Sequence, residues 1–418
     1  MKSNIWLNLW AKIKKFGLEY DDFPTTIENV SLLLRILTID LYKKSDKRIP
    51  LIFHVMTAIA GLSFFYGYIF SMLWLVFFRY GLSNVKISFS NINTLLTTKK
   101  INLISDLFNV NREDVRNTVD RFLKCDSQVI SDTRFYKNLR KYLRVVKRRA
   151  TVIWVFLISD GAVYIIIPFV VPGRLFTVDI IVIYGLEPML ETPNYEIATF
   201  ITTLSVGFAV YTMVSVAVYV IVIVGYNEAQ LHALSEELLN VWDDSQYFYN
   251  NMKHRITDKV HAVYIRNKII NEFIRIRLRD IIKFHIANIN LMREFDHDIR
   301  STLAIEYTIN TISIITELLG GLENTYLQLP YTAVHILMVC LAGQRIIDAC
   351  DHFEKSVYSC KWENFNTSNR RTVYLMLIMS QKTLMLSAGG VVKLNFTCMM
   401  NILRSTYSTY TTLKSMVK

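Results

Sequence analysis

The chain has few cysteines, and their positions predict neither a disulfide nor a metal site. There are five, Cys125, Cys340, Cys350, Cys360 and Cys398. None falls in a segment that we predict to be extracellular, so no extracellular disulfide is expected. The ten-residue spacing of Cys340, Cys350 and Cys360 lacks the Cys-x-x-Cys pairs of a structural zinc site. We therefore expect reduced thiols and no metal.

Catalytic signatures, internal repeats and low-complexity segments are also missing from the sequence. No P-loop, kinase, hydrolase or zincin motif occurs. The amino-terminal stretch from Ile5 to Phe16 is amphipathic and is interrupted by three lysines, unlike a cleavable signal peptide. These absences argue against an enzyme, a cofactor-dependent protein and a cleaved leader.

Apolar residues are abundant instead. They make up 52% of the 418 residues, and the mean hydropathy is +0.27, which is typical of membrane proteins. The net charge of +12 does not indicate nucleic acid, because the basic residues lie in loops beside apolar runs and not on one soluble face. The expected partner is a lipid bilayer, not nucleic acid.

The apolar runs predict seven membrane spans, since about 20 apolar residues cross a bilayer as a helix. Five are well defined in the sequence: 49–78, 150–173, 197–227, 324–344 and 383–403. The span at 303–322 contains Glu306 and Glu317, which we expect near its two membrane boundaries. The span at 85–106 is the most polar of the seven.

The basic residues predict the orientation of these spans. Of the 47 Lys and Arg residues, 40 lie in four blocks, before residue 50 and at 99–149, 253–300 and 345–382. Cytosolic loops are rich in Lys and Arg, so all four blocks are placed in the cytosol. This placement requires the polar span at 85–106, because without it the second block would face outward.

The predicted fold is therefore an all-α membrane protein with seven transmembrane helices, a cytosolic amino terminus and an extracellular carboxyl terminus. Residues 1–48 form a cytosolic segment, residues 49–350 hold the first six spans, and residues 351–418 hold a cytosolic helix and the last span. Helical periodicity at 112–142 and 228–242 predicts helices that extend below the bilayer. Their amphipathic faces are expected to pack within the chain or against another subunit.

The last span is too polar for a helix that faces only lipid. Asn401, Ser405, Ser408 and Thr412 recur at spacings of four, three and four, so they share one stripe. Such a stripe indicates hydrogen bonds between helices or contact with water, and water would make this the pore helix. Lys393, expected in the middle of the span, would face a pore or crevice.

Aromatic and branched residues in the outer halves of three other spans are candidates for a binding pocket. They are Trp154, Ile158 and Tyr164, then Phe200, Leu204, Phe208 and Tyr211, and finally Tyr307 and Ile314. Asp160 is the candidate polar contact, since a carboxylate within a span is expensive to bury. Core packing and lipid contact remain alternatives for the aromatic stripe, and a bridging hydrogen bond remains an alternative for Asp160. A pocket here would suit a small apolar molecule with one or two polar atoms.

Several local strings in the chain are characteristic: YGLEPM at 184–189, PNYE at 193–196, GYNEAQ at 225–230, ELLGGLEN at 317–324, CKWE at 360–363, LSAGG at 386–390 and YSTYTTL at 407–413. These strings resemble the insect odorant receptor family, and most closely its moth pheromone-receptor branch. The resemblance runs from about Pro50 to the end of the chain.

The resemblance implies a tuning subunit of a ligand-gated, non-selective cation channel, a heterotetramer with the odorant co-receptor. It implies a plasma-membrane location in olfactory sensory neurons, a small volatile apolar ligand, a pocket among helices two to six and a cytosolic inter-subunit anchor. Phe89 of the second helix joins the pocket candidates, and Tyr407, Thr411, Thr412 and Leu413 join the pore candidates. Thr412 and Leu413 stand where the family has an aliphatic gate residue, and Thr409 replaces a family tyrosine.

Two other functions remain as alternatives. A metabotropic seven-helix chemoreceptor would have an extracellular amino terminus and basic blocks in the opposite loops. A secondary transporter would show inverted repeats and helices broken at mid-membrane. The third span has Gly161 and Pro168, but no matching second half of the chain accompanies them.

Overall fold

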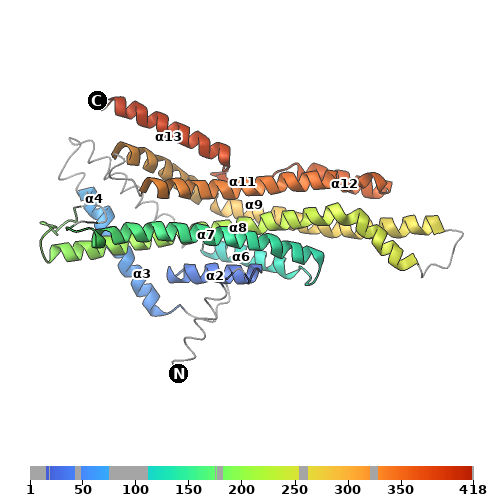
Figure 1. Ribbon diagram of the computed structural model, residues 1–418, viewed down its shortest axis with the longest axis horizontal. Coiled ribbons are helices and arrows are strands. Elements are labelled where there is room, and N and C mark those ends of the chain that lie inside the picture. Colours follow the sequence, from blue (N-terminus) through green and yellow to red (C-terminus); the bar gives the residue numbers. More distant parts are fainter. Residues whose placement is uncertain are drawn as a thin grey trace, which may run out of the picture.

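The computed structural model is almost entirely helical, as predicted (Figure 1). It describes residues 16–17, 19–42, 49–74, 112–174, 176, 182–253, 262–320 and 328–416. The predicted second span at 85–106 lies outside these residues. The helices are α2 (Phe23–Ile36), α3 (Leu51–Phe64), the π-helical η1 (Phe65–Phe70), α4 (Ser71–Trp74), α6 (Arg112–Ser127), α7 (Arg134–Val170), α8 (Asn194–Met252), α9 (Ala262–Gly320), α11 (Gln328–Tyr358), the short η5 (Trp362–Asn364), α12 (Thr367–Ser380) and α13 (Phe396–Met416).

Helix α8 forms the centre of the bundle. It contacts α2, α3, α7, α9 and α11, and every side chain from Thr212 to Leu231 is buried. A helix that is surrounded on all sides must be apolar around its whole circumference, which explains the run of Val, Ile and Ala in this segment. Helices α2 and α13 lie at opposite edges of the bundle in Figure 1.

The long helices extend well beyond a bilayer. At about 1.5 Å per residue, the 37 residues of α7 and the 59 residues each of α8 and α9 exceed the roughly 30 Å hydrocarbon core. Among the described helices, α7, α8 and α11 contain segments long and apolar enough to cross a membrane. The predicted extension at 228–242 is confirmed, because α8 continues without a break to Met252.

The segment 112–142 folds as two helices and not as the single extension suggested by its periodicity. Helix α6 ends at Ser127, and Asp132 adopts a positive φ of 65° in the turn that follows. The hydroxyl oxygen of Thr133 then accepts a hydrogen bond from the backbone N–H of Tyr136 at 3.2 Å, which caps the start of α7.

Two glycines allow α7 and α8 to approach closely. A Cβ on Gly161 of α7 would lie 2.6 Å from Val210 of α8, and a Cβ on Gly225 of α8 would lie 2.2 Å from Val146 of α7. Near the cytosolic boundary, the guanidinium of Arg149 donates two hydrogen bonds to Glu228, at 2.8 and 3.0 Å. Small residues and a largely buried ion pair therefore fix this helix pair.

The predicted last span at 383–403 is misplaced, because the helix begins at Phe396. Residues Ser387–Ala388 (β1) and Val392–Lys393 (β2) form an antiparallel hairpin whose turn contains Gly389 and Gly390, both with positive φ. Hydropathy counts these glycines with the apolar run, whereas their φ values turn the chain back. Asn395 then caps α13, since its side-chain oxygen accepts a hydrogen bond from the N–H of Cys398 at 2.8 Å.

Lys393 is therefore not within a span. It lies on β2 and is exposed. The hairpin is bound to α9, where Asp296 accepts hydrogen bonds from the N–H and hydroxyl of Ser387 at 2.6 and 2.9 Å. The N–H of Gly389 donates to the carbonyl of Arg300 at 2.9 Å. These contacts place the hairpin just before the apolar part of α9, which begins near Leu303.

Candidate ligand site and pore helix

An apolar cluster fills the outer part of the bundle, where α3, the loop before α8, and helices α7, α8 and α11 meet. Its buried members are Phe64, Ile183, Ala198, Val206, Ala209 and Met213, and Tyr164, Met189 and Tyr331 pack against it. The loop is held over this end because Tyr66 donates a hydrogen bond to the carbonyl of Tyr184 at 2.6 Å. We call this group of residues the outer core.

Polar groups occur at the edge of the outer core. The hydroxyl of Tyr164, one of the predicted pocket residues, accepts a hydrogen bond from the amide of Gln328 at 2.9 Å. The hydroxyl oxygen of Tyr331 is buried and has no hydrogen-bond partner in the part of the chain that is described. The Tyr331 ring stacks on His335 with centroids 6.5 Å apart. The outer core is therefore apolar, with the hydroxyl groups of Tyr164 and Tyr331 at its edge.

Glu306 and Glu317, the two carboxylates of the predicted span at 303–322, are buried between α9 and α11. Glu306 is buried, and one of its oxygens lies 3.0 Å from Nδ1 of His335 on α11. Glu317 is also buried and accepts hydrogen bonds from Ser313 at 3.1 Å and Thr332 at 3.0 Å. Both carboxyl groups therefore join α9 to α11, since buried polar groups require partners of this kind.

The predicted pocket residues divide into separate groups. Tyr164 belongs to the outer core, whereas six others belong to the main core or pack against it: Trp154, Ile158, Phe208, Tyr211, Tyr307 and Ile314. Leu204 and Asp160 are half-buried. Phe200 is 64% exposed, so the face of α8 that carries it points away from the bundle, and its predicted place in an internal pocket is wrong. Phe89 lies outside the described residues.

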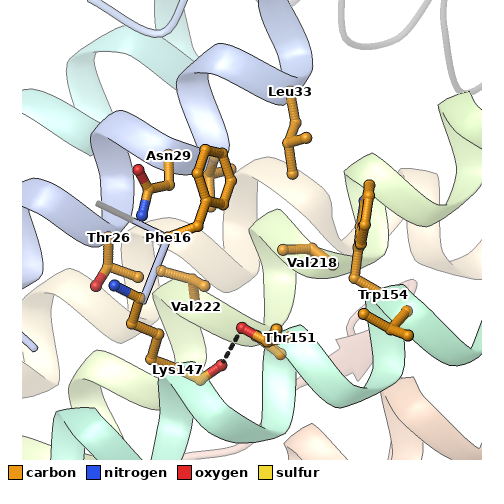
Figure 2. Close-up of a pocket in the computed structure, with 12 residues that line it drawn as sticks. Phe16, Thr26, Asn29, Leu33, Lys147, Thr151, Trp154, Val218 and Val222 are labelled. Carbon is orange, nitrogen blue, oxygen red and sulfur yellow. Dashed lines mark hydrogen bonds between the residues drawn. The ribbon is translucent and has the colours of Figure 1, made fainter. Parts of the chain in front are cut away.

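An apolar cavity lies lower in the bundle than the predicted pocket, between α2, α7 and α8 (Figure 2). Its volume is about 360 Å³. Among the predicted pocket residues that the structure describes, Trp154 alone lines it. The lining residues are Phe16, Thr26, Asn29, Val30, Leu33, Lys147, Ala150, Thr151, Trp154, Val155, Val218 and Val222.

Helix α2 forms one wall of this cavity, and the apolar-run pattern did not predict it. Asp22 caps its start by accepting a hydrogen bond from the N–H of Thr25 at 2.9 Å, and Ile27, Val30 and Leu34 form its buried face. The motif Asp-Phe-Pro followed by apolar residues at helical spacing is the signal that predicts such a helix.

The carboxyl end of α2 is anchored to two other helices. The carbonyl of Leu33 accepts a hydrogen bond from the hydroxyl of Tyr211 on α8 at 2.9 Å. The carbonyl of Ile36 accepts one from Thr57 on α3 at 3.2 Å. Terminal carbonyls have no partners within their own helix, so these side chains complete the helix end. Tyr211, expected in the pocket, has this anchoring contact instead.

Helix α13 has three distinct faces. Thr406 is buried, and Ile402, Tyr410 and Leu413 are half-buried on the side that packs against α9 and α11. Tyr407 and Thr411 are exposed on a second, mostly apolar face with Met400 and Leu403. The third face carries the predicted polar stripe, in which Asn401, Ser405, Ser408 and Thr412 are all exposed. No other element of the described chain covers this stripe.

The cytosolic end carries an exposed apolar patch on α11, η5 and α12. Tyr358, Trp362, Tyr374, Leu375, Ile378 and Met379 are its exposed members, which we call the α12 patch. Three of these residues, Tyr358, Trp362 and Tyr374, line a groove of about 310 Å³ between the end of α11 and α12. Apolar surface that clusters outside the membrane is typical of a protein interface.

The neighbouring cytosolic core contains a histidine that burial keeps neutral. The ring of His285 on α9 lies 4.3 Å from that of Phe353 on α11, centroid to centroid. Desolvation in this setting lowers the pKa of His285 to about 4. Phe353 and the other apolar residues around His285 belong to the main core of the bundle, which continues along α8 into this end of the molecule.

Comparison with known proteins agrees with this architecture. The family described as 7tm Odorant receptor matches residues 105–407. The structure of the olfactory receptor OR5 from Machilis hrabei superposes with a TM-score of 0.71 at 12% identity, covering 93% of this chain and 97% of that chain. The same receptor in complex with eugenol gives a TM-score of 0.70 at 11% identity, with the same coverage. No curated protein matches the sequence.

At this low identity the two structures establish the fold, a helical membrane protein of the seven-helix olfactory receptor type. The family match covers most of the chain and is independent of the superposition. Both findings confirm the predicted receptor class and identify no enzyme. The chain belongs to the 7tm Odorant receptor family.

Proposed function

We propose that the chain is the ligand-binding subunit of a heteromeric, ligand-gated, non-selective cation channel formed with the odorant co-receptor. The ligand is a small volatile apolar molecule of pheromone type, with an aliphatic chain and one or two polar atoms. The subunit acts at the plasma membrane of olfactory sensory neurons, with its amino terminus in the cytosol.

The polar stripe on α13 is the main support for a channel. Its four side chains are exposed while the opposite side of the same helix packs on α9 and α11. A polar stripe at membrane depth that the described part of the chain leaves uncovered is stable only against water or another subunit. A central pore surrounded by several copies of such a helix supplies both the water and the neighbouring subunits.

The outer core supports an apolar ligand. Its buried side chains are aliphatic or aromatic, and Tyr331 offers a hydroxyl that has no hydrogen-bond partner among the described residues. One such donor fits an alcohol, aldehyde or ester at the end of a hydrocarbon chain. Binding opens the channel to the extent that the ligand prefers the open state over the closed one.

The principal test is current recording from cells that express the chain with and without the co-receptor, across an odorant panel. We expect odour-evoked cation current in the pair and none with either subunit alone. Current from this chain alone would refute the heteromer. Current in the pair that disappears under G-protein blockade would favour a metabotropic receptor instead.

The α12 patch provides a second test, of assembly. Leu375 is 62% exposed, and its replacement by glutamate is expected to reduce recovery of the co-receptor in pull-down at least several-fold, because it places a charge in an apolar interface. Val263→Glu, on an exposed residue at the start of α9, is the matched control and should assemble normally. Equal recovery with both variants would exclude the α12 patch from the interface.

A further inference from the structure

The cavity between α2, α7 and α8 lies at the predicted cytosolic boundary of the membrane. The apolar part of α7 starts at Ala150, directly after Lys147, Arg148 and Arg149. Lys147 and Ala150 both line the cavity, which then follows α7 upward to Trp154 and Val155. One end is therefore at headgroup level, and the rest lies at the depth of the lipid chains in the inner leaflet.

The cavity opens sideways and not into the bundle. Val155 is 50% exposed and Thr151 is also exposed, yet both belong to the lining. The inner wall is formed by Val218 and Val222 of α8, which are 4% and 2% exposed. Figure 2 shows these two valines between α2 and α7, with Trp154 and Lys147 toward opposite ends. The opening along α7 faces the side of the molecule that the hydrocarbon would surround.

The walls of the cavity are held by specific contacts. The ammonium of Lys147 donates hydrogen bonds to the carbonyls of Gly17 and Tyr20 at 2.8 and 2.7 Å, which binds the chain before α2 to α7. Together with the contacts of Tyr211 and Thr57, these bonds fix α2 at both ends. At about 360 Å³, the space is within the range of roughly 300–1,000 Å³ that small-molecule sites occupy.

Arg148 provides a cation on α7 beside the lining residue Lys147, although it does not itself line the cavity. It is exposed, in contrast to the buried Lys147 beside it. Arg148 and Val155 are seven residues apart and thus lie on the same face of α7, two turns from each other. Guanidinium groups bind phosphate through paired hydrogen bonds. A phosphate at Arg148 would place the chain attached to it along Val155, at the cavity opening.

We propose that this cavity is a phospholipid site, in which one acyl chain from the cytosolic leaflet lies between α2, α7 and α8 while its phosphate contacts Arg148. The site is separate from the outer core and does not depend on the channel function proposed above. A lipid here would contact α2, which is hydrogen-bonded to Tyr211 of α8. Bilayer composition would therefore act on the bundle through α2.

The test uses the full-length chain in nanodiscs that contain phosphatidylserine with a photoreactive diazirine in its acyl chain. After irradiation, peptide mapping is expected to find label at 218–222 of α8. Bulk lipid does not reach these residues, because α8 is buried there, so label at this segment reports a chain inside the cavity. No label at 218–222 in the wild-type chain would overturn the proposal.

Two variants and a matched control sharpen the result. Val155→Trp fills the opening and is expected to reduce label at 218–222 at least fivefold. Val163→Trp is the control, since Val163 lies on the same helix, is equally 50% exposed and does not line the cavity. Equal labelling in Val155→Trp and Val163→Trp would overturn the site. Arg148→Gln is expected to weaken labelling, and unchanged labelling would overturn the phosphate contact.

Discussion

Replacement of Gly343 by alanine is expected to reduce odour-evoked current at least tenfold while leaving the chain at the cell surface. A Cβ on Gly343 of α11 would lie 1.9 Å from the carbonyl oxygen of Leu394, the second residue before α13. That oxygen belongs to the backbone, so no side-chain rotation relieves the clash. Overpacking of this kind costs about 1–3 kcal/mol, or the backbone must move.

The backbone at Leu394 has little freedom to move. Its N–H donates to the carbonyl of Leu386 at 3.0 Å, and the hairpin between them is bound to Asp296 and Arg300 of α9. A displaced Leu394 therefore tilts α13 against α9 and α11, which would disturb a gate formed by that helix. The expected loss is tenfold or more in current per receptor at the surface.

The matched control for this variant is Gly207→Ala. Gly207 lies within α8 in the membrane, and a Cβ there would be 3.6 Å from Ile165, an ordinary contact. Alanine also favours helix more than glycine does, so this variant should give wild-type current. Surface labelling and co-receptor pull-down are measured for both. Wild-type current from Gly343→Ala would show that the Gly343–Leu394 contact does not position α13.

The architecture of the central helices could be read from the sequence because their signals are local. The predicted spans at 150–173, 197–227 and 324–344 coincide with apolar parts of α7, α8 and α11. The helical spacing of the leucines at 231–239 predicts the continuation of α8 into the cytosol. The last helix was misplaced because a hydropathy window cannot distinguish Gly389 and Gly390 in a helix from the same residues with positive φ.

The candidate sites depended more on tertiary contacts, which the sequence alone does not reveal. The helical period showed that Phe200 and Leu204 share a side of α8, but only packing shows that Phe200 points away from the bundle. The pairing of Glu306 with His335 joins two helices and has no sequence signature. The stripe on α13 was predictable, because a period of 3.6 residues is a property of the helix itself.

Cysteine substitutions on α13 are expected to show that its polar stripe is reached by a water-soluble thiol reagent and that its apolar face is not. Ser408→Cys, with the co-receptor, should give current that a cationic, thiol-specific methanethiosulfonate reduces several-fold in the presence of odour. The reagent attacks thiolates, which form in water but not in hydrocarbon. Ser408 is exposed, and its stripe is the part of α13 that we place against the aqueous pore.

Leu403→Cys is the matched control, since Leu403 is also exposed but lies on the apolar face of the same helix. Its thiol should face lipid or a neighbouring subunit and should not react. The wild-type chain shows whether native thiols respond, and four of its five cysteines are buried. Block of Leu403→Cys and not of Ser408→Cys would place the apolar face in the pore and would reverse the assignment. Because both variants keep the packed face of α13 intact, a difference between them reports water access and not misfolding.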